Sequence, residues 1–564
     1  MLFKGAAVKP LPIGVSDYKE ACKGYYYVDK TLLIRDFLDE RSKVSLFTRP
    51  RRFGKTLNMD MLRTFFEKTE EDTLIYFQDK KICGCGEAYL AHQGKYPVIF
   101  LSFKDVKNST WQATYRSLQK LLAQEFRRHQ ELANSIALSS FERTEYELLS
   151  TESADLVSYQ MSLSTLTLLL HKHYGIAPIV IIDEYDTPIQ QGHVYGFYDQ
   201  VIGFMRNLFS GGLKDNPHLS YGFLTGILRV AKESIFSGLN NLKINSILDQ
   251  PYSEYFGFTA SEVQEMAAYY QAAGKYQEIC AWYNGYSFGG REIFNPWSVV
   301  SYFNNGCKPK AFWQATGSNS IIGEILAMAT PEVMAKLERL MKGESFITHI
   351  DTSVIYPQIK HNPTSVYSFL LVAGYLKAVD CEQRYGEDYI CRVALPNKEI
   401  AFVYSKEILS QLKGNEAPAL ALAVQEALYL GNGNLLQKAL EKFLMASISF
   451  YDASSEGFYH GLVLGLCAVM DNSYHITSNR EAGEGRYDIQ LLPLAKRLPG
   501  ILIELKAGKA CTQTQLEKLA EEALLQINSR SYEAELRAMN INSIIKLGIA
   551  FSGKQARIAA VRED

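Results

Sequence analysis

Short apolar runs alternate with longer stretches of helical periodicity through the first 250 residues. The clearest runs are Val44–Thr48, Val98–Phe103, Ile179–Ile182 and Tyr221–Gly226, each followed by polar residues or glycine. Uninterrupted apolar runs of this length are typical of strands buried on both faces of a parallel sheet. Strands that alternate with helices favour an α/β fold. We therefore expect residues 1–250 to form a domain built on a parallel sheet.

The pattern becomes helical and aromatic in residues 251–345, which we expect to form a helical lid region. It contains two aromatic clusters, Trp282–Tyr286 and Asn295–Ser298. Such clusters are more typical of core packing and turns than of ligand binding. We therefore expect them to support the fold of this region.

The remaining chain predicts two further segments. Residues 346–446 begin with a helix at Tyr367–Ala373 and two strands, Leu376–Val379 and Tyr389–Leu395, followed by helix. A helix followed by a hairpin favours a winged-helix-like module joined to a helical linker. Residues 447–564 run helix, strand, strand, strand, helix, strand, which predicts a separate small α/β domain.

Composition excludes several classes of protein. The chain of 564 residues exceeds what one hydrophobic core supports, and its 47% apolar and 21% charged residues are ordinary for a globular protein. The net charge of −2 gives no general attraction to nucleic acid, so contact with DNA requires local basic patches. No signal-peptide-like segment and no run of about 18 apolar residues is present, so we expect no membrane association.

The nine cysteines are scattered along the chain. The one close pair, Cys83 and Cys85, lacks the second pair that a zinc site requires. We therefore expect structural thiols that are reduced, as in a cytoplasmic protein.

The strand Val44–Thr48 leads through Arg49–Phe53 into Gly54, Lys55 and Thr56, and a helix follows. A P-loop needs a strand, a turn that faces phosphate and a helix N-terminus that favours anions. It also needs a lysine for the phosphates and a hydroxyl for magnesium, which Lys55 and Thr56 supply. The alternative is an ordinary basic turn.

Arg49 occupies the position of the first glycine of a standard P-loop. A non-glycine residue in a left-handed conformation costs roughly 1–2 kcal/mol. The loop therefore either follows a different path or uses its arginines in place of some backbone contacts.

A second buried strand, Ile179–Ile182, ends in Asp183 and Glu184. An aspartate at such a strand end can hold magnesium, and the following glutamate can orient or deprotonate the attacking water. Two acids that simply begin a loop are the alternative. The combination with Gly54–Thr56 favours a nucleoside triphosphatase.

Polar and basic residues follow the fourth strand. Thr225 stands where a group that senses the γ-phosphate would lie, and Arg229 and Lys232 come just beyond it. Either basic residue could contact phosphate in its own chain or in a neighbouring subunit. A solvated basic turn is the alternative.

The C-terminal region carries a second acidic pattern, with Asp488 on one strand and Glu504 and Lys506 on the next. Residues two apart on a strand share a face, so Glu504 and Lys506 point the same way. Two carboxylates on adjacent strands repel one another unless a divalent cation lies between them, and magnesium prefers such oxygen ligands. With Lys506 positioning the nucleophile, the metal could activate water against a phosphodiester.

Two flanking residues extend this pattern. Glu456 begins a predicted helix and could supply a third acid, and Gln526 lies on the helix Gln513–Asn528, where it could contact the scissile phosphate or a metal-bound water. A solvated strand end remains the alternative. The order of these residues on helix, strand, strand and helix favours a metal-dependent nuclease site.

The N-terminal half resembles a bacterial AAA-ATPase-like family whose P-loop has the pattern R-P-R-R-F-G-K-[ST]. The matching segments are Tyr27–Thr31, Arg49–Thr56, Ile182–Asp186, Leu224–Arg229, Tyr283–Tyr286 and Asn295–Ser298. The C-terminal part resembles the PD-(D/E)XK nuclease superfamily, through Asp488, Glu504–Lys506 and Gln526. Arginine is the usual residue at position 49 in the ATPase family, so its presence is a family feature.

The resemblance implies ATP and Mg²⁺ as cofactors. Thr56 and Asp183 would hold one magnesium, Asp488 and Glu504 another, and residues 27–30 would lie near the nucleotide base. The residues expected to bind nucleotide are Tyr27, Asp29, Lys30, Arg49, Arg51, Arg52, Phe53, Gly54, Lys55, Thr56, Asp183 and Thr225.

Three functions follow as hypotheses. The first is an ATPase that gates a metal-dependent nuclease acting on DNA. The second is an ATP-driven switch whose nuclease-like fold only binds nucleic acid or a partner, which the winged-helix-like module would suit. The third is a signalling ATPase that forms homo-oligomers, with Arg229 acting across subunits.

Overall fold

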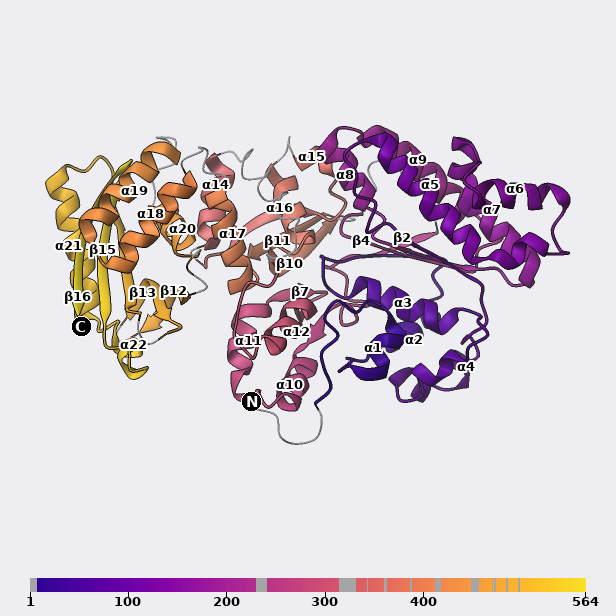
Figure 1. Ribbon diagram of the computed structural model, residues 1–564, viewed down its shortest axis with the longest axis horizontal. Coiled ribbons are helices and arrows are strands. Elements are labelled where there is room, and N and C mark those ends of the chain that lie inside the picture. The colour runs from indigo at the N-terminus through magenta and orange to yellow at the C-terminus, as the bar shows by residue number, and fades with distance from the viewer. Residues whose placement is uncertain are drawn as a thin grey trace. The chain divides into compact units, whose positions relative to one another are not determined.

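The computed structural model describes most of the chain. Two compact units are present, Met1–Trp313 with Ile347–Asn397 and Gln314–Phe346 with Lys398–Asp564, here called the first and second units (Figure 1). The four-segment division drawn from the sequence stays a prediction. Described are residues 8–563 except 230–240, 314–330, 342, 360–362, 386–387, 411–416, 448–455, 469, 471–472, 483–484 and 496–497.

The first unit contains a five-stranded parallel sheet of order β2-β3-β4-β1-β5. The expected α/β fold is therefore confirmed, and β5 is the strand that the sequence pattern missed. The strands are β1 (Val44–Thr48), β2 (Val98–Ser102), β3 (Ile179–Asp183), β4 (Tyr221–Gly226) and β5 (Leu242–Asn245).

Strand β1 lies between β4 and β5, so the chain leaves it toward one half of the sheet and returns on its other side. Ligands of open α/β sheets bind at such a point, beyond the carboxyl ends of the strands. The carboxyl ends of β1 and β4 lie side by side, with Thr48 paired to Gly226, and β3 ends next to β4 at Asp183. This arrangement brings the predicted P-loop and the acidic strand end to one edge of the sheet.

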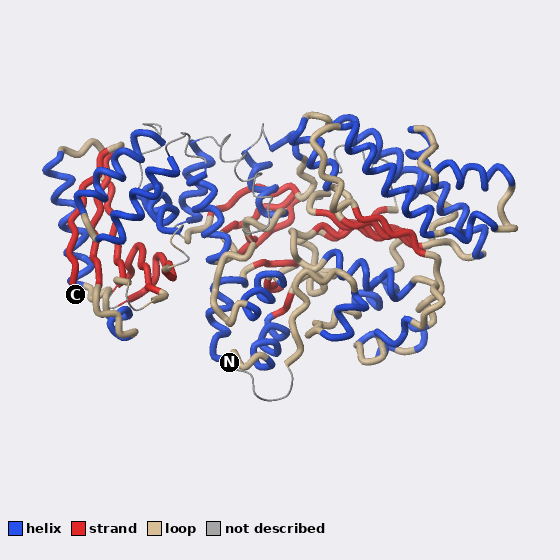
Figure 2. The backbone as a smooth tube through the Cα atoms, in the orientation of Figure 1, coloured by secondary structure: helices blue, strands red, loops and turns tan. Residues whose placement is uncertain are grey.

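Helices cover both faces of this sheet. Helices α1–α4 lie on one face and α5–α9 on the other (Figure 1), and the strands form a layer between them (Figure 2). Their bounds, with the short 3₁₀ helices, are α1 (Tyr18–Gly24), α2 (Leu32–Glu40), α3 (Lys55–Phe66), η1 (Thr73–Tyr76), η2 (Lys81–Cys85), α4 (Glu87–Leu90), α5 (Trp111–Arg128), η3 (Gln130–Asn134), α6 (Ser140–Ser150), α7 (Leu156–Tyr174), α8 (Thr187–Tyr195) and α9 (Tyr198–Leu213).

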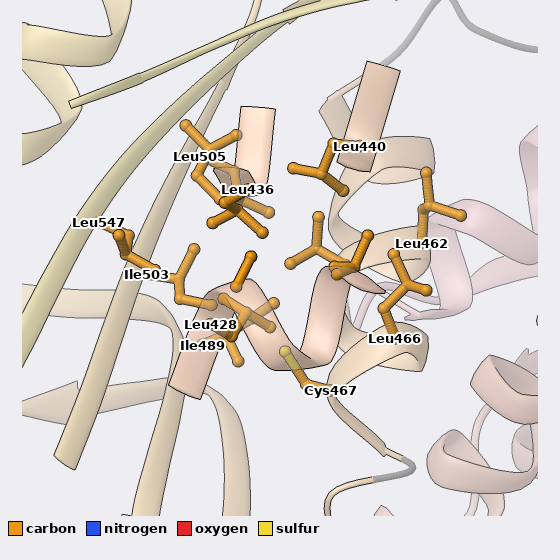
Figure 3. Packing of buried hydrophobic residues seen from close by; sticks show 14 of the residues in the cluster. Leu428, Leu436, Leu440, Leu462, Leu466, Cys467, Ile489, Ile503, Leu505 and Leu547 are labelled. Carbon is orange, nitrogen blue, oxygen red and sulfur yellow. The ribbon is translucent and has the colours of Figure 1, made fainter. Parts of the chain in front are cut away.

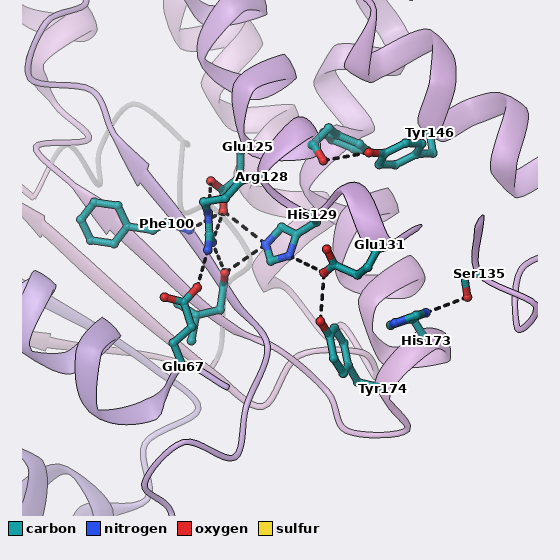
Figure 4. A network of polar contacts seen from close by, with 12 residues as sticks. Glu67, Phe100, Glu125, Arg128, His129, Glu131, Ser135, Tyr146, His173 and Tyr174 are labelled. Carbon is teal, nitrogen blue, oxygen red and sulfur yellow. Dashed lines mark hydrogen bonds and ion pairs between the residues drawn. The ribbon is translucent and has the colours of Figure 1, made fainter. Parts of the chain in front are cut away.

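Charged side chains at the end of α5 form hydrogen bonds with backbone groups of the edge strand β2 (Figure 4). Glu125 accepts the N–H of Phe100 at 2.7 Å, and both Arg128 and His129 contact the carbonyl of Val98. An edge strand with free N–H and C=O groups is a template for pairing with another chain. These contacts cover that edge within the same molecule.

The acids of this network are held ionised. Burial alone would raise the pKa of Glu125, but the charge of Arg128 and hydrogen bonds from His129 and Arg128 outweigh it and lower the pKa to about 2. Glu131 accepts from His129 at 3.1 Å and from Tyr174 at 3.0 Å. Burial would lower the pKa of His129, yet its bonds to Glu125 and Glu131 raise it.

The rest of the first unit contains two small three-stranded sheets, of order β6-β8-β7 and β10-β11-β9, with their helices. The helix and hairpin predicted within residues 367–395 are present as α16 and β10–β11. The elements are β6 (Phe258–Thr259), α10 (Ala260–Tyr269), η5 (Ala273–Lys275), α11 (Tyr276–Tyr283), β7 (Tyr286–Phe288), β8 (Arg291–Phe294), α12 (Pro296–Asn304), β9 (Phe346–Asp351), α15 (Tyr356–Ile359), α16 (Pro363–Val372), β10 (Lys377–Tyr385) and β11 (Asp388–Ala394).

Cys381 and Cys391 form a disulfide across the β10–β11 hairpin, so the prediction of reduced thiols is wrong for these two residues. They face each other directly in the strand register, with Cα atoms 4.1 Å apart. The sequence pattern ended the first strand at Val379, before Cys381, and the pairing was therefore not visible. The other cysteines are free.

The second unit places helices against a mixed sheet of order β12-β13-β14-β15-β16. One strand more is present than the sequence pattern indicated, and β14 and β15 pair in parallel. The elements are α14 (Pro331–Met341), α17 (Lys398–Ser410), α18 (Ala417–Leu430), α19 (Gly433–Ser447), α20 (Glu456–Ala468), β12 (Tyr474–Ala482), β13 (Gly485–Pro493), β14 (Gly500–Ala507), α21 (Gln513–Ser529), α22 (Ala534–Ala538), β15 (Ile544–Ser552) and β16 (Gln555–Glu563).

One face of this sheet forms a core with α18, α19 and α20 (Figure 3). Ile489 on β13 and Ile503 and Leu505 on β14 pack there against Leu440 and Leu466 of the helices. Because successive strand residues alternate between faces, Asp488 and Glu504 are directed away from this core. The apolar pattern of these strands thus sets the side on which the acidic residues lie.

We expect Glu125→Gln to destabilise the first unit at neutral pH. The substitution removes the charge that pairs with Arg128 and His129. Breaking a buried pair costs about 3–5 kcal/mol, and the cost is at the low end here because Arg128 is partly exposed. Because the pKa of Glu125 is lowered, its contribution is present above about pH 4.5 and is lost as the pH falls toward 2. Urea unfolding between pH 7 and 3 should show a lower free energy of unfolding and a weaker acid dependence than wild type.

Gln124→Ala is the matched control, because Gln124 is the exposed neighbour on the same helix. It should leave unfolding unchanged. Equal stability of Glu125→Gln and wild type at pH 7 would show that the network does not hold the edge strand.

Candidate functional site

The P-loop region begins where β1 ends at Thr48 and continues to α3, which starts at Lys55. Gly54 caps this helix with a φ of 79°, a left-handed conformation that glycine adopts without strain. The buried Lys55 ammonium donates to the carbonyls of Arg49 at 3.1 Å and Pro50 at 2.8 Å. A helix N-terminus whose first residue is a lysine provides N–H groups and a positive charge for binding an anion.

Burial lowers the pKa of Lys55, and the nearby carboxylates of Glu184, Asp186 and Asp183 oppose that shift. The lysine is therefore surrounded by acids on the side of β3. Phosphate oxygens at the helix N-terminus would add the negative charge that favours the ammonium form.

Arg49 does not contact the cavity, although it was expected among the nucleotide-binding residues. Its side chain is fully buried and donates to the carbonyls of Thr48 at 2.9 Å and Asn245 at 2.7 Å. The guanidinium also lies 5.2 Å from the ring of Phe256 and 5.5 Å from that of Phe288. Arg49 thus fastens the start of the loop to β5, which is a structural task.

The strained position of the loop is Arg52 and not Arg49. Arg52 has a φ of 69°, in the left-handed region, and its guanidinium lies 4.2 Å from the ring of Trp297. Phe53 is buried against Tyr286 and Phe288, with ring centroids 4.9 and 5.1 Å away. Aromatic packing therefore holds the loop in the conformation that these two residues adopt.

Two further residues complete the surroundings of the loop. Arg51 donates to Gln190 of α8 at 2.6 Å. Gly257, with a φ of 112°, leaves room for Phe53, since a Cβ there would approach the Phe53 ring to 3.1 Å. No local sequence pattern marks Gly257, because its role depends on a contact between distant segments.

Asp183, at the end of β3, is fully buried and joins three elements. It accepts from Thr56 of α3 at 2.8 Å, from Thr225 of β4 at 2.7 Å and from Ser102 of β2 at 3.3 Å. Burial raises the pKa of Asp183, and the hydrogen bonds from Thr225 and Thr56 oppose that shift. The structure thus brings the two residues predicted to share a magnesium ion into direct contact.

Thr225 lies behind Asp183. Its hydroxyl donates to Asp183 and accepts the backbone N–H of Glu184 at 3.3 Å. Both contacts orient the acidic strand end, and Thr225 does not line the cavity described below.

Glu184 has a φ of 51° and a half-buried side chain that lines the cavity. The next two residues turn back to the sheet. Tyr185 donates to the carbonyl of Leu228, and Asp186 accepts the N–H groups of Ile227 at 2.8 Å and Leu228 at 3.1 Å. Burial raises the pKa of Asp186, and these backbone hydrogen bonds counteract it.

A cavity of about 330 Å³ opens at this edge of the sheet. Its size and mostly apolar walls fit a small-molecule ligand. It joins the N-terminus of α3 to the segment before α1 and to α12, so its residues come from distant parts of the first unit. They include Ile13, Gly14, Val15, Tyr26, Tyr27, Val28, Lys30, Arg52, Phe53, Gly54, Lys55, Thr56, Asn58, Glu184, Tyr255, Phe258, Pro296, Trp297 and Val300.

The segment Tyr27–Lys30 borders the cavity, but its charged groups are engaged elsewhere. The Lys30 ammonium contacts the Glu262 carboxylate at 2.6 Å and the carbonyl of Glu254 at 2.7 Å. Burial lowers the pKa of Lys30, and the charge of Glu262 opposes it. Asp29 accepts from Thr31 and from the N–H of Lys81 at 2.7 Å, outside the cavity lining.

Arg229 is half-buried and does not line the cavity. Burial lowers its pKa, while the nearby Tyr185 and Asp351 act in the opposite direction. The neighbours of Arg229 in this structure are therefore Tyr185 and Asp351 of its own chain. Lys232 lies outside the described residues.

In the second unit, Asp488 and Glu504 lie opposite each other. The ladder between β13 and β14 ends at Ile489 and Ile503, and continuing that register pairs Asp488 with Glu504. The Asp488 carboxylate accepts the N–H of Leu505 at 2.7 Å, where the strands part. The two predicted acids therefore meet at one end of the gap between these strands.

The other predicted residues of the second unit approach from α21 and β14. Gln526 donates to Glu504, and the Lys506 ammonium lies 3.8 Å from Glu504. Glu504 is only 3% exposed, whereas the Lys506 side chain is 30% exposed. A buried acid beside a half-exposed cation at a strand end provides oxygen ligands of the kind that magnesium prefers.

The predicted third acid, Glu456, begins α20, but its side chain lies outside the described part of the structure. On the same helix, the ring of His460 contacts the Asp488 carbonyl at 3.2 Å. Among the described residues, no group of three or more His, Cys, Asp or Glu side chains is placed to hold a metal. Within those same residues, no helix has the length and apolar character needed to cross a bilayer.

Comparison with known proteins agrees with the two predicted kinds of domain. Residues 12–236 match the family described as "Predicted AAA-ATPase", and residues 454–561 match the PD-(D/E)XK nuclease superfamily. The chain therefore combines an AAA-ATPase-like domain with a PD-(D/E)XK nuclease superfamily domain. It is also similar to a protein of Azotobacter chroococcum mcd 1 described as "Uncharacterized protein in vnfD 5'region", with 26% identity over 562 residues and 96% of each chain covered.

We expect Arg49→Gly, which introduces the glycine of a standard P-loop, to destabilise the protein. It removes a fully buried side chain and leaves the carbonyls of Thr48 and Asn245 without their donor, at a cost of about 3 kcal/mol or more. Urea unfolding measures the effect. Arg41→Gly is the control, because Arg41 is exposed with a φ of 57° and glycine is favoured there. Unchanged stability of Arg49→Gly would refute the fastening role.

Proposed function

We propose that the AAA-ATPase-like domain binds and hydrolyses ATP. The observation that supports this most directly is the 2.8 Å contact of Thr56 with the buried Asp183, next to Lys55 at the mouth of the cavity. A hydroxyl and a carboxylate in this relation are the magnesium ligands of P-loop enzymes. Magnesium held by them would supply positive charge against the phosphate oxygens.

Each residue of the chain has a task in this proposal. Lys55 exchanges its loop carbonyls for β- and γ-phosphate oxygens, and the N-terminus of α3 supplies N–H groups to the same phosphates. Glu184, turned into the cavity by its left-handed backbone, orients the attacking water or accepts its proton. Thr225 holds Asp183 in position from behind.

Lys55→Ala should lower ATP turnover by about 100-fold or more, because the phosphates lose their main cation. Asp183→Asn should have a similar effect and should also weaken the dependence on magnesium. Phosphate release and nucleotide titration measure both variants. Lys107→Ala, at an exposed lysine of the same domain, is the control. Full turnover in Lys55→Ala would exclude the loop as the site of hydrolysis.

We further propose that the C-terminal domain is a magnesium-dependent nuclease that acts on DNA and that the ATPase gates it. The supporting observation is the meeting of Asp488 and the buried Glu504 where β13 and β14 part, with Gln526 bonded to Glu504. Lys506, beside Glu504, is placed to orient or activate the nucleophile. Gln526 would contact the scissile phosphate or a water near it, and Glu456 would supply a third acid.

We expect Asp488→Asn and Glu504→Gln to abolish DNA cleavage, lowering it by at least about 100-fold, since each removes a negatively charged ligand of the metal. A plasmid-nicking assay with magnesium or manganese, with and without ATP, measures the loss. Lys55→Ala should keep basal cleavage and lose its response to ATP. Glu521→Gln, at an exposed residue of α21, is the control. Cleavage that survives in both acid variants would refute the nuclease assignment.

A C-terminal domain that only binds is the competing function. The observation that favours it is the small number of acids at this site. Among the described residues, Asp488 and Glu504 form a pair, and no third His, Cys, Asp or Glu joins them as a metal ligand. DNA retention that responds to nucleotide, without strand breaks, would support it. The segment predicted to be a winged-helix-like module is poorly suited to bind DNA. Its helix α16 is buried from Val366 to Val372, and its exposed strand β10 carries Asp380 and Glu382, each paired to an arginine.

A further inference from the structure

The segment Asn295–Ser298 has no task in the function proposed above. Asn295 is buried and caps α12 by accepting the N–H of Ser298 at 3.1 Å, as the sequence prediction of turn chemistry expects. Trp297 differs from this prediction. It stands in the first turn of α12, is partly exposed and lines the same cavity as Lys55 and Thr56.

Trp297 packs against the P-loop through Arg52. The guanidinium carbon of Arg52 lies 4.2 Å from the centroid of the Trp297 ring, within the range of a cation–π interaction. Stacking occupies the flat face of a guanidinium, whereas phosphate is bound by N–H groups in its plane. An arginine in this arrangement can therefore stay on the tryptophan while it binds a phosphate.

The backbone of Arg52 supports the same conclusion. It is left-handed, with a φ of 69°, in a loop where glycine would adopt that conformation without strain. The next residue, Phe53, packs against Tyr286 and Phe288. The side chains of Arg52 and Phe53 therefore both contact residues 286–297. This direction of Arg52 is therefore imposed by the region that carries α12.

Trp297 also has an unmet hydrogen-bonding requirement. Its Nε1 N–H is buried and has no partner among the residues that the structure describes. A buried donor without an acceptor is costly.

We propose that Trp297 is a positioning residue for the triphosphate, which holds Arg52 over the cavity so that Arg52 binds the phosphates of the nucleotide. The inference rests on the proposed ATP site and adds a recognition element outside the standard P-loop. In this chain an arginine held against a tryptophan ring takes over part of the work of the glycine that Arg49 replaces.

The test is ATP affinity in a double-mutant cycle of Arg52→Gln and Trp297→Leu, by calorimetry on the full chain. Each single variant should weaken ATP binding by about 10-fold, as expected for a partly buried cation–π pair. The double variant should be little weaker than either single one, because the two residues act together. Trp297→Phe keeps a ring and should lose about 3-fold. Losses that multiply would overturn the coupling.

A spectroscopic measurement separates positioning from general support of the fold. Trp297 is one of four tryptophans, and ATP should change the indole fluorescence of wild type but not of Trp297→Phe. Trp111→Leu, at the start of α5 and away from the cavity, is the control and should keep both ATP affinity and the fluorescence change. An unaltered ATP response in Trp297→Phe would refute the proposal.

The outcomes also distinguish this inference from the proposed function. If wild type binds no ATP and Lys55→Ala changes nothing, the nucleotide site itself is wrong. If wild type binds ATP through Lys55 while the Arg52 and Trp297 variants bind it equally well, only the present inference fails. A loss of adenosine binding as large as the loss of ATP binding would show that Trp297 contacts the base, which also contradicts it.

Discussion

The buried carboxylate of Asp183 is the contact on which the N-terminal site depends. It lies at the end of β3 without exposure and is bonded to hydroxyls from α3, β4 and β2. A buried carboxylate is costly unless it is hydrogen-bonded, and here three neighbouring elements supply the bonds. Their positions fix the P-loop helix relative to the acidic strand. The negative charge is thereby held next to the N-terminus of α3, where a cation with phosphate would lie.

The loop between β1 and α3 has an unusual sequence for a P-loop. Where glycines would let the backbone turn freely, this chain packs its side chains. Arg49 is buried against β5, and Phe53 is buried in an aromatic cluster. The loop is therefore shaped by contacts with residues 245–297 more than by its own conformational preferences. A consequence is that the region after the sheet and the loop cannot move independently.

The second unit solves a related problem with strands. The apolar residues of β13 and β14 pack one face of the sheet against the helical core. The alternate positions face the other way, and Asp488 and Glu504 occupy two of them. Where the ladder ends, Asp488 accepts the N–H that the next pair would otherwise use. Asp488 thus replaces a backbone acceptor at the point where the ladder between the two strands ends.

The sequence alone determined the strands β1 to β4, the helix after Gly54, and the order of Asp488, Glu504, Lys506 and Gln526, since apolar runs and residue alternation act locally. It also indicated the partnership of Thr56 with Asp183, because the carboxyl ends of parallel strands meet at one edge. Only the tertiary structure decided the contacts of Arg49, Lys30 and Trp297. Their partners, Asn245, Glu262 and Arg52, come from distant segments, and no local pattern records whether a charged side chain faces a ligand or the interior.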